Sequence, residues 1–215
     1  MQLEQDNPGA TIVPIIISTD KTQLTLFRNK AAYPVYITIG NIPKEIRRKP
    51  SHHAQTLLAY LPAARLEHIQ NKSSRRRSLA NLFHACMAKV LQPLESAGIS
   101  GMEMASGDGV IRRCHPLLAA FVGDYPEQCL VTCTKHCPKC PISKDELGED
   151  KALPVRALGP VLEALSAVND GPGTYSNACK EAGIKPVIHP FWENLPYVHI
   201  FQSITPTSYT NSTKE

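Results

Sequence analysis

The sequence lacks any long hydrophobic run, which excludes a simple membrane-spanning helix. No stretch approaches the roughly 18 consecutive apolar residues that such a helix needs. The amino-terminal residues, MQLEQDNPGA, are polar and lack the apolar core of a secretory signal peptide. We therefore expect an intracellular protein.

Two kinds of catalytic motif are also missing. The chain has no glycine-rich GxxxxGKS or GxxxxGKT phosphate loop, and nothing marks the nucleophile of a Cys-His protease. Aromatic residues make up only 6% of the chain. Trp192 and Tyr197 can stack on nucleic-acid bases, but we favour ordinary packing for both. The 215 residues show no internal repeat, and this length suits either one large domain or one domain with a small insertion.

Positive charge is concentrated in the first half of the chain. The formal net charge is +4, yet residues 28–77 hold 11 Lys and Arg against two Asp and Glu. This imbalance predicts a phosphate-facing surface, and a solvated loop face is the competing interpretation. The segment RRKP also resembles a nuclear-localisation patch. The residues predicted to face DNA phosphates are Arg47, Arg48, Lys49, Arg75, Arg76 and Arg77.

The beginning of the chain has the composition of a β-meander. The β-branched run at 11–19 predicts a strand, residues 23–27 predict its hairpin partner, and 31–43 predict a third strand. Residues 54–62 are compatible with either a strand or a helix. Three successive strands indicate an antiparallel start to an α/β domain.

Helical patterns follow. Apolar residues recur at helical spacing over 73–98, which predicts a helix capped by Ser73 or Ser74, kinked or ended at Pro93 and stopped by Gly98. Further helices are predicted at 154–168 and 174–183. Between them, residues 106–114 predict a turn and a strand, 125–150 an irregular insert, and 185–197 a packed loop.

Two apolar, strand-like segments end on an acidic residue. Asp20 follows PIIIST, and Asp124 follows PLLAAFVG. Neighbouring strands of an open sheet would bring these carboxylates together, and Mg²⁺ or Mn²⁺ would relieve their repulsion. Such ions can activate a water or a 3′-hydroxyl for attack on a phosphodiester. Asp also caps turns where strands stop, and spacing alone favours that simpler interpretation.

Four of the seven cysteines lie within CLVTCTKHCPKC, residues 129–140. This density favours zinc over a disulfide framework. The CPKC spacing is that of a zinc knuckle, although a second CxxC pair is missing. A redox CxxC would need a thioredoxin-like βαβ context, which is absent, and free buried thiols are the remaining alternative. The predicted ligands are Cys133, Cys137 and Cys140, with the fourth from Cys179, His189 or His136.

Several stretches together resemble one family. They are IIISTDKTQLTLF, AYPVYITIGNIPKEIRRKP, FVGDYPEQ, CPKC and AGIKPVIHPFWENLPYVHIFQSITP. In combination they resemble the Plavaka-type transposases of fungal genomes, in the Kyakuja–Dileera–Zisupton superfamily. The likeness runs from about Gly9 to about Pro206.

The resemblance implies an α/β fold of the ribonuclease H-like kind, a mixed sheet flanked by helices, with a small Cys-rich zinc-binding insert. It implies a DDE active site with Asp20 and Asp124 as the first two acids and Mg²⁺ ligands. The third acid is expected beyond SITP, and the contexts of Glu163, Glu181 and Glu193 do not match it. The implied organisation is the first part of the catalytic domain at 9–124, the zinc-knuckle insert at 125–150, a helical continuation at 151–206 and a disordered tail at 207–215.

We therefore predict a fragment of a nuclear, cut-and-paste DNA transposase that acts on transposon ends and target DNA. Homo-oligomers are an option for the full-length enzyme, and the fragment alone is expected to be inactive. Two alternatives stay open. One is a non-catalytic, zinc-stabilised DNA-binding module, and the other is a decayed transposon relic that folds poorly.

Overall fold

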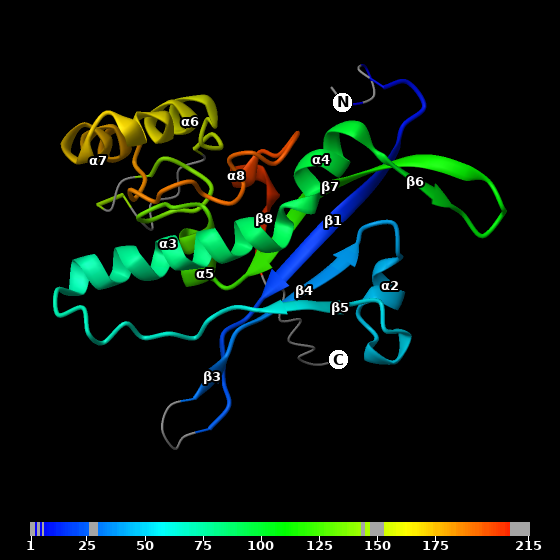
Figure 1. Ribbon diagram of the computed structural model, residues 1–215, viewed down its shortest axis with the longest axis horizontal. Helices are drawn as coiled ribbons and strands as arrows, with labels where there is room; N and C mark the ends of the chain where they lie inside the picture. Colours follow the sequence, from blue (N-terminus) through cyan, green and yellow to red (C-terminus); the bar gives the residue numbers. More distant parts are fainter. Residues whose placement is uncertain are drawn as a thin grey trace.

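The computed structural model describes residues 3, 5, 7–25, 30–142, 145–146 and 153–206. These residues form an α/β protein with a mixed, curled sheet flanked by helices (Figure 1). The strands run in the order β5-β4-β1-β7, and β6 and β8 both pair with β7. Within the described part of the chain, no helix is long and apolar enough to cross a membrane.

The sheet begins as an antiparallel meander. β1 (Thr11–Thr19) pairs with β4 (Pro34–Ile39), and β4 pairs with β5 (Thr56–Tyr60), so the ambiguous 54–62 segment is a strand. Buried side chains alternate with half-buried ones along the second half of β1, which places one face of the strand on the core. The predicted hairpin partner is wrong: β2 (Thr22–Gln23) pairs with β3 (Ala31–Ala32), not with β1.

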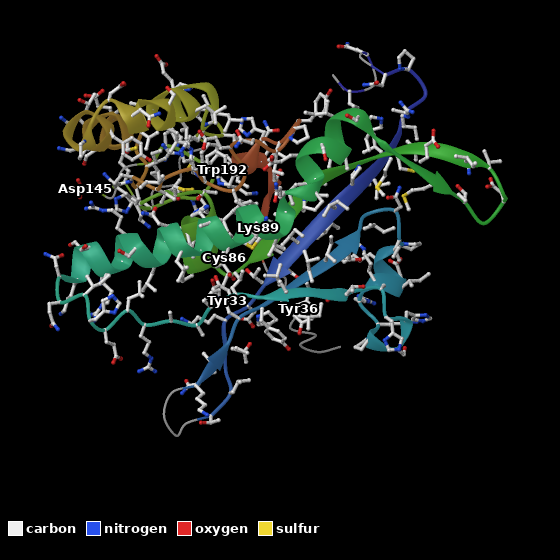
Figure 2. All side chains as sticks on the ribbon, viewed as in Figure 1. Tyr33, Tyr36, Cys86, Lys89, Asp145 and Trp192 are labelled. Carbon is white, nitrogen blue, oxygen red and sulfur yellow. The ribbon has the colours of Figure 1, made fainter. Side chains whose placement is uncertain are left out.

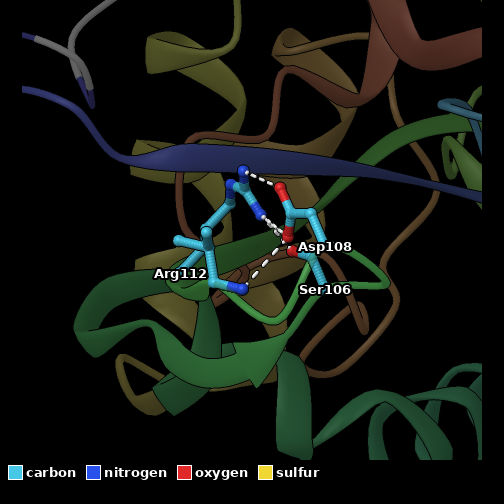
Figure 3. Close-up of polar contacts among 4 residues, drawn as sticks. Ser106, Asp108 and Arg112 are labelled. Carbon is cyan, nitrogen blue, oxygen red and sulfur yellow. Dashed lines mark hydrogen bonds and ion pairs between the residues drawn. The ribbon is translucent and has the colours of Figure 1, made fainter.

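The parallel part of the sheet is built on β7 (Ile111–Gly123). β7 lies parallel to β1, with Ser18 opposite Val122. On its other edge, β6 (Met102–Ala105) pairs with the beginning of β7, and β8 (Ile204–Pro206) runs parallel to its end. The β6–β7 turn is closed by Arg112, which donates to both Asp108 oxygens at 2.9 and 2.7 Å and also bonds to Ser106 (Figure 3).

The long predicted helix is two helices that meet at Pro93, namely α3 (Lys72–Leu91) and α4 (Pro93–Ser100). Its predicted cap is wrong, because the Asn71 side chain accepts from the Ser74 N–H at 3.0 Å. Gly98 does not end α4 either. It is a close-packing position, where a Cβ would come within 2.5 Å of Pro196 Cγ.

Shorter helices complete the described chain. α2 (Lys44–Arg47) and η2 (Pro50–His52) connect β4 to β5, while α8 (Ile200–Ser203) precedes β8. α6 (Gly159–Ser166), η3 (Ala167–Asn169) and α7 (Pro172–Glu181) pack together, confirming the two later helical predictions within a few residues. α5 (Tyr125–Val131) was missed, because the beginning of the predicted irregular insert is helical.

The core lies between the sheet and α3. Phe83, Met87 and Leu91 of α3 pack with buried side chains of β1, β4 and β7. Packing is confirmed for Trp192 of the 185–197 segment, whose indole is buried and donates to the Val131 carbonyl at 2.6 Å (Figure 2). Tyr197, in the same segment, is exposed.

His84 connects three segments of this core. Its Nε2 bonds to the Leu130 carbonyl at 3.0 Å, and the Phe191 N–H donates to its Nδ1 at 3.4 Å. Burial lowers the pKa of His84 to about 4. The neutral ring therefore has a structural role.

Candidate active site

The structure brings the two predicted acids to one edge of the sheet. β1 and β7 are adjacent and parallel, and Asp20 and Asp124 each lie two residues beyond the paired Ser18 and Val122. Both side chains are exposed. Both carboxylates also act on the same buried neighbour, because their charges raise the pKa of Glu127. Two acids separated by about a hundred residues in sequence therefore share one local environment.

The turn-capping interpretation is correct for one oxygen of Asp124. Its Oδ1 accepts from the Glu127 N–H at 2.9 Å and so caps α5. The cap uses one of the two carboxylate oxygens, so capping by Oδ1 is compatible with cation binding by Oδ2. Within the described residues, the Asp20 side chain accepts one marginal local contact, from the Thr22 hydroxyl at 3.5 Å.

Glu127 is a third carboxylate at this edge, and the sequence interpretation missed it. Its side chain is 7% exposed, and its Oε1 accepts from the Tyr33 hydroxyl at 2.6 Å and from the Thr19 hydroxyl. Burial raises the pKa of Glu127 to about 7, the charges of Asp124 and Asp20 add to this, and the two hydroxyl bonds oppose it. The sequence offers one indication of this position: Glu127 lies three residues after Asp124, which caps α5.

Tyr33 supports the same group from the other side. It lies between β3 and β4 (Figure 2), with its ring stacked on Phe83 at a centroid distance of 5.9 Å. Burial, followed by the Glu127 charge and hydrogen bond, raises the pKa of Tyr33 above its usual range. Tyr33 is therefore a neutral hydrogen-bond donor to Glu127.

The donor chemistry of the Asp20 and Asp124 pair suits a hard cation. Mg²⁺ binds through one or two carboxylates together with water and phosphate oxygens. Among the residues that the structure describes, no group of three or more His, Cys, Asp or Glu side chains is arranged to hold a metal ion. The pair matches a cation site that solvent and substrate would complete, and it is not a closed protein cage.

The cysteines fall into two separate groups. In the first, the Lys139 and Cys140 N–H groups donate to Cys137 Sγ at 3.4 and 3.3 Å. Burial acts to raise the pKa of Cys137, but these bonds and one from the Cys140 thiol lower it overall. Cys129 belongs to this group, because its thiol and the Tyr125 hydroxyl both bond to the His136 carbonyl.

The second group, Cys133 and Cys179, is buried. Cys133 Sγ lies 3.5 Å from His84 Nε2. Burial raises the pKa of Cys133 far above its usual range, and Cys179 adds to this. His189 is exposed and bonds to Glu193 at 3.1 Å. The predicted zinc ligands are therefore spread over separate places in the described chain.

The two basic clusters lie at different ends of the sheet. Arg75, Arg76 and Arg77 are in the first turns of α3, and Arg76 lines a hollow together with Lys21, the neighbour of Asp20. Arg47, Arg48 and Lys49 lie in and after α2. β4 runs antiparallel to β1, and its last residue, Ile39, pairs with Ile15 in the middle of β1. The Arg47 cluster therefore follows the end of β4 that points away from Asp20 (Figure 1). Ile15 itself is about 17 Å from Asp20 along the strand, at ~3.3 Å per residue.

The comparison with known proteins identifies the family of this chain. No curated protein and no solved structure matches the chain. The family model described as Plavaka transposase matches residues 1–209, which is nearly the whole sequence and includes both strand-end acids. The chain therefore belongs to the Plavaka transposase family.

Proposed function

We propose that this chain carries the first two acids of a DDE transposase catalytic domain with a ribonuclease H-like fold. The sheet order supports the fold, because an antiparallel meander is followed by β7 parallel to β1 and β8 parallel to β7. The observation that carries the proposal is the placement of Asp20 and Asp124 at the matched ends of β1 and β7.

In the proposed reaction, Asp20 and Asp124 hold Mg²⁺ or Mn²⁺ beside a phosphodiester of nuclear DNA. The bound cation supplies charge neutralisation and activation of a water or 3′-hydroxyl. The two acids orient it, and their exposure at the sheet edge leaves room for a phosphate group. Arg75, Arg76 and Arg77 attract the DNA backbone without reading its sequence.

We expect no turnover from this chain alone. A DDE site needs three acids, and only two are assigned to this edge. Glu127 is the third carboxylate there, but it is buried and bonded to Thr19 and Tyr33. Detectable Mg²⁺-dependent nicking of plasmid DNA that is lost in Asp20→Asn would refute this expectation.

The proposed zinc site is centred on Cys137 and Cys140. The two N–H bonds to Cys137 Sγ favour a thiolate, which is the form that binds zinc. Cys129 is the third candidate ligand, because its thiol bonds to the carbonyl of His136, the residue before Cys137, as does the Tyr125 hydroxyl. Cys133 instead contacts His84. Elemental analysis tests this: Cys137→Ser and Cys140→Ser should remove bound zinc, and Cys86→Ser, on α3, should not.

The test of the carboxylate site is calorimetric titration with Mg²⁺ or Mn²⁺. We expect the parent chain to bind the cation and the Asp20→Asn/Asp124→Asn variant to lose binding. Asp170→Asn is the control, because it removes an exposed acid beside η3 and should leave binding unchanged. Binding that survives the double substitution would contradict the proposal.

The alternatives predict different outcomes in the same experiments. A non-catalytic zinc-stabilised DNA-binding module would keep its DNA affinity and metal content in the Asp20→Asn/Asp124→Asn variant, and its parent chain would show no carboxylate-dependent Mg²⁺ binding. A decayed relic that folds poorly would aggregate, so a purified monomer with a cooperative melt would count against it.

A further inference from the structure

Two hollows lie side by side along the first half of α3. The larger, about 510 Å³, is lined by residues of α3, α5 and the 185–187 segment. The smaller, about 280 Å³, extends from α3 to Tyr33 and Lys21. Both are lined by Arg76, Ala80 and Leu130, so the two hollows are direct neighbours, and we name the pair the α3 groove.

The α3 groove leads to the proposed active site. At one end, Lys21 follows Asp20 directly, and Tyr33 donates to Glu127. Pro126, in the wall of the larger hollow, lies two residues after Asp124. Each hollow is therefore lined by a residue that lies within two positions of a strand-end acid in the chain.

The lining has the chemistry of a nucleotide-binding surface. Its cations are Lys21, Arg76, Arg77 and Lys185, all exposed, and among the described residues that line the two hollows none is acidic. The walls between these cations are mostly apolar, including Leu79, Leu130 and Val187. Cations match phosphates, and apolar walls match the faces of bases.

The apolar lining of the groove favours an unpaired strand over a duplex. A duplex presents phosphates to a basic surface and keeps its bases stacked inside, so the apolar walls would contribute nothing to its binding. An unpaired strand can place its bases against those walls while its phosphates reach the surrounding cations. The hollows are also in the size range of sites for small organic groups.

We propose that the α3 groove binds an unpaired stretch of DNA and directs one of its phosphates to Asp20 and Asp124. This inference rests on the proposed function, because it names the strand that the carboxylate site would act on. Binding in the groove is nevertheless separable from metal chemistry, since it involves different side chains.

Fluorescence anisotropy tests whether the α3 groove prefers an unpaired strand. The probes are a labelled 12-nucleotide single strand and a hairpin duplex of the same sequence, and EDTA removes divalent cations. Arg76→Ala/Lys185→Ala should weaken single-strand binding at least tenfold. It should also reduce the slope of log affinity against log salt concentration by about 1.4, because each of the two lost phosphate contacts contributes ~0.7. Arg47→Ala/Arg48→Ala removes the same charge at the other end of the sheet and should change affinity less than threefold. Equal losses from the two variants would overturn the proposal.

The apolar walls need their own variant. Ala80→Glu places a carboxylate in the wall that both hollows share, and it should weaken single-strand binding at least fivefold. Ala85→Glu, on the exposed side of the same helix, is the matched control and should have little effect. If Ala80→Glu fails to fold by circular dichroism, Arg76→Ala/Lys185→Ala decides alone, because both of its side chains are exposed.

Three further outcomes are informative. Tighter binding of the duplex, or equal competition by poly-glutamate, would overturn the proposal in favour of a general anion surface. Asp20→Asn/Asp124→Asn should keep single-strand affinity in EDTA. If that variant binds the strand and the parent fails to bind Mg²⁺, the proposed function fails while the groove is supported.

Discussion

Replacing Glu127 with Gln should stabilise the fold at neutral and alkaline pH. Gln has nearly the same shape and keeps Oε1, which accepts hydrogen bonds from Tyr33 and Thr19. It removes a negative charge that is buried beside Asp20 and Asp124. The substitution therefore isolates the cost of ionising a third carboxylate at this edge.

The magnitude follows from the pKa of Glu127, which rises from 4.5 to about 7 on folding. Because the folded-state pKa is higher, the stabilising contribution of this group is fully present below pH 4.5 and is lost as the pH rises through 7. This rise corresponds to about 3 kcal/mol, at 1.36 kcal/mol per unit of pKa. The side chain is only 7% exposed, so solvent screening reduces this value little.

The assay is urea unfolding at pH 5 and pH 8 in EDTA, for the parent and for Glu127→Gln. The variant should be more stable than the parent at pH 8 by about 2 to 3 kcal/mol, and this advantage should become small at pH 5. Glu181→Gln, an exposed position at the end of α7, is the control and should follow the parent. Parallel pH profiles for Glu127→Gln and the parent, or a variant that is less stable at pH 8, would refute the reasoning.

Three more predictions concern stability. The pKa of His84 is lowered to about 4, so the stabilising contribution of its neutral ring is full above pH 6.5 and is lost as the pH falls through 4. His84→Gln should therefore reduce the loss of unfolding free energy between pH 6.5 and pH 4, as measured by urea unfolding. Tyr33→Phe should cost about 1 kcal/mol in the same assay at pH 8, because Glu127 loses a donor. Gly98→Ala should lower the free energy of unfolding by about 1–3 kcal/mol, since its Cβ would come within 2.5 Å of Pro196 Cγ. Gly107→Ala should leave the free energy of unfolding unchanged, because nothing lies within 4 Å of the added Cβ. Equal melting temperatures for the two glycine variants would contradict the packing argument.

Local patterns in the sequence predicted the elements whose signals were strong and continuous. β1 and β7 are β-branched or apolar runs that end on an acid, and Pro34 begins β4 as expected for a residue without an N–H. The helix cap was missed because Asn71 lies close to Ser73 and Ser74, and both Asn and Ser can cap a helix. Which one does so depends on where the preceding loop enters the helix.

The sequence by itself placed Asp20 and Asp124 at strand ends, the basic residues in the first half and the CPKC segment in one loop. These are local facts, set by residue type and near neighbours. The tertiary structure decided that β1 and β7 are adjacent and parallel, that Glu127 is buried beside both acids, and that Cys133 lies against His84. Such pairings depend on distances between residues far apart in the chain, and pKa values and ligand sets are determined by those distances and by burial, which no local pattern encodes.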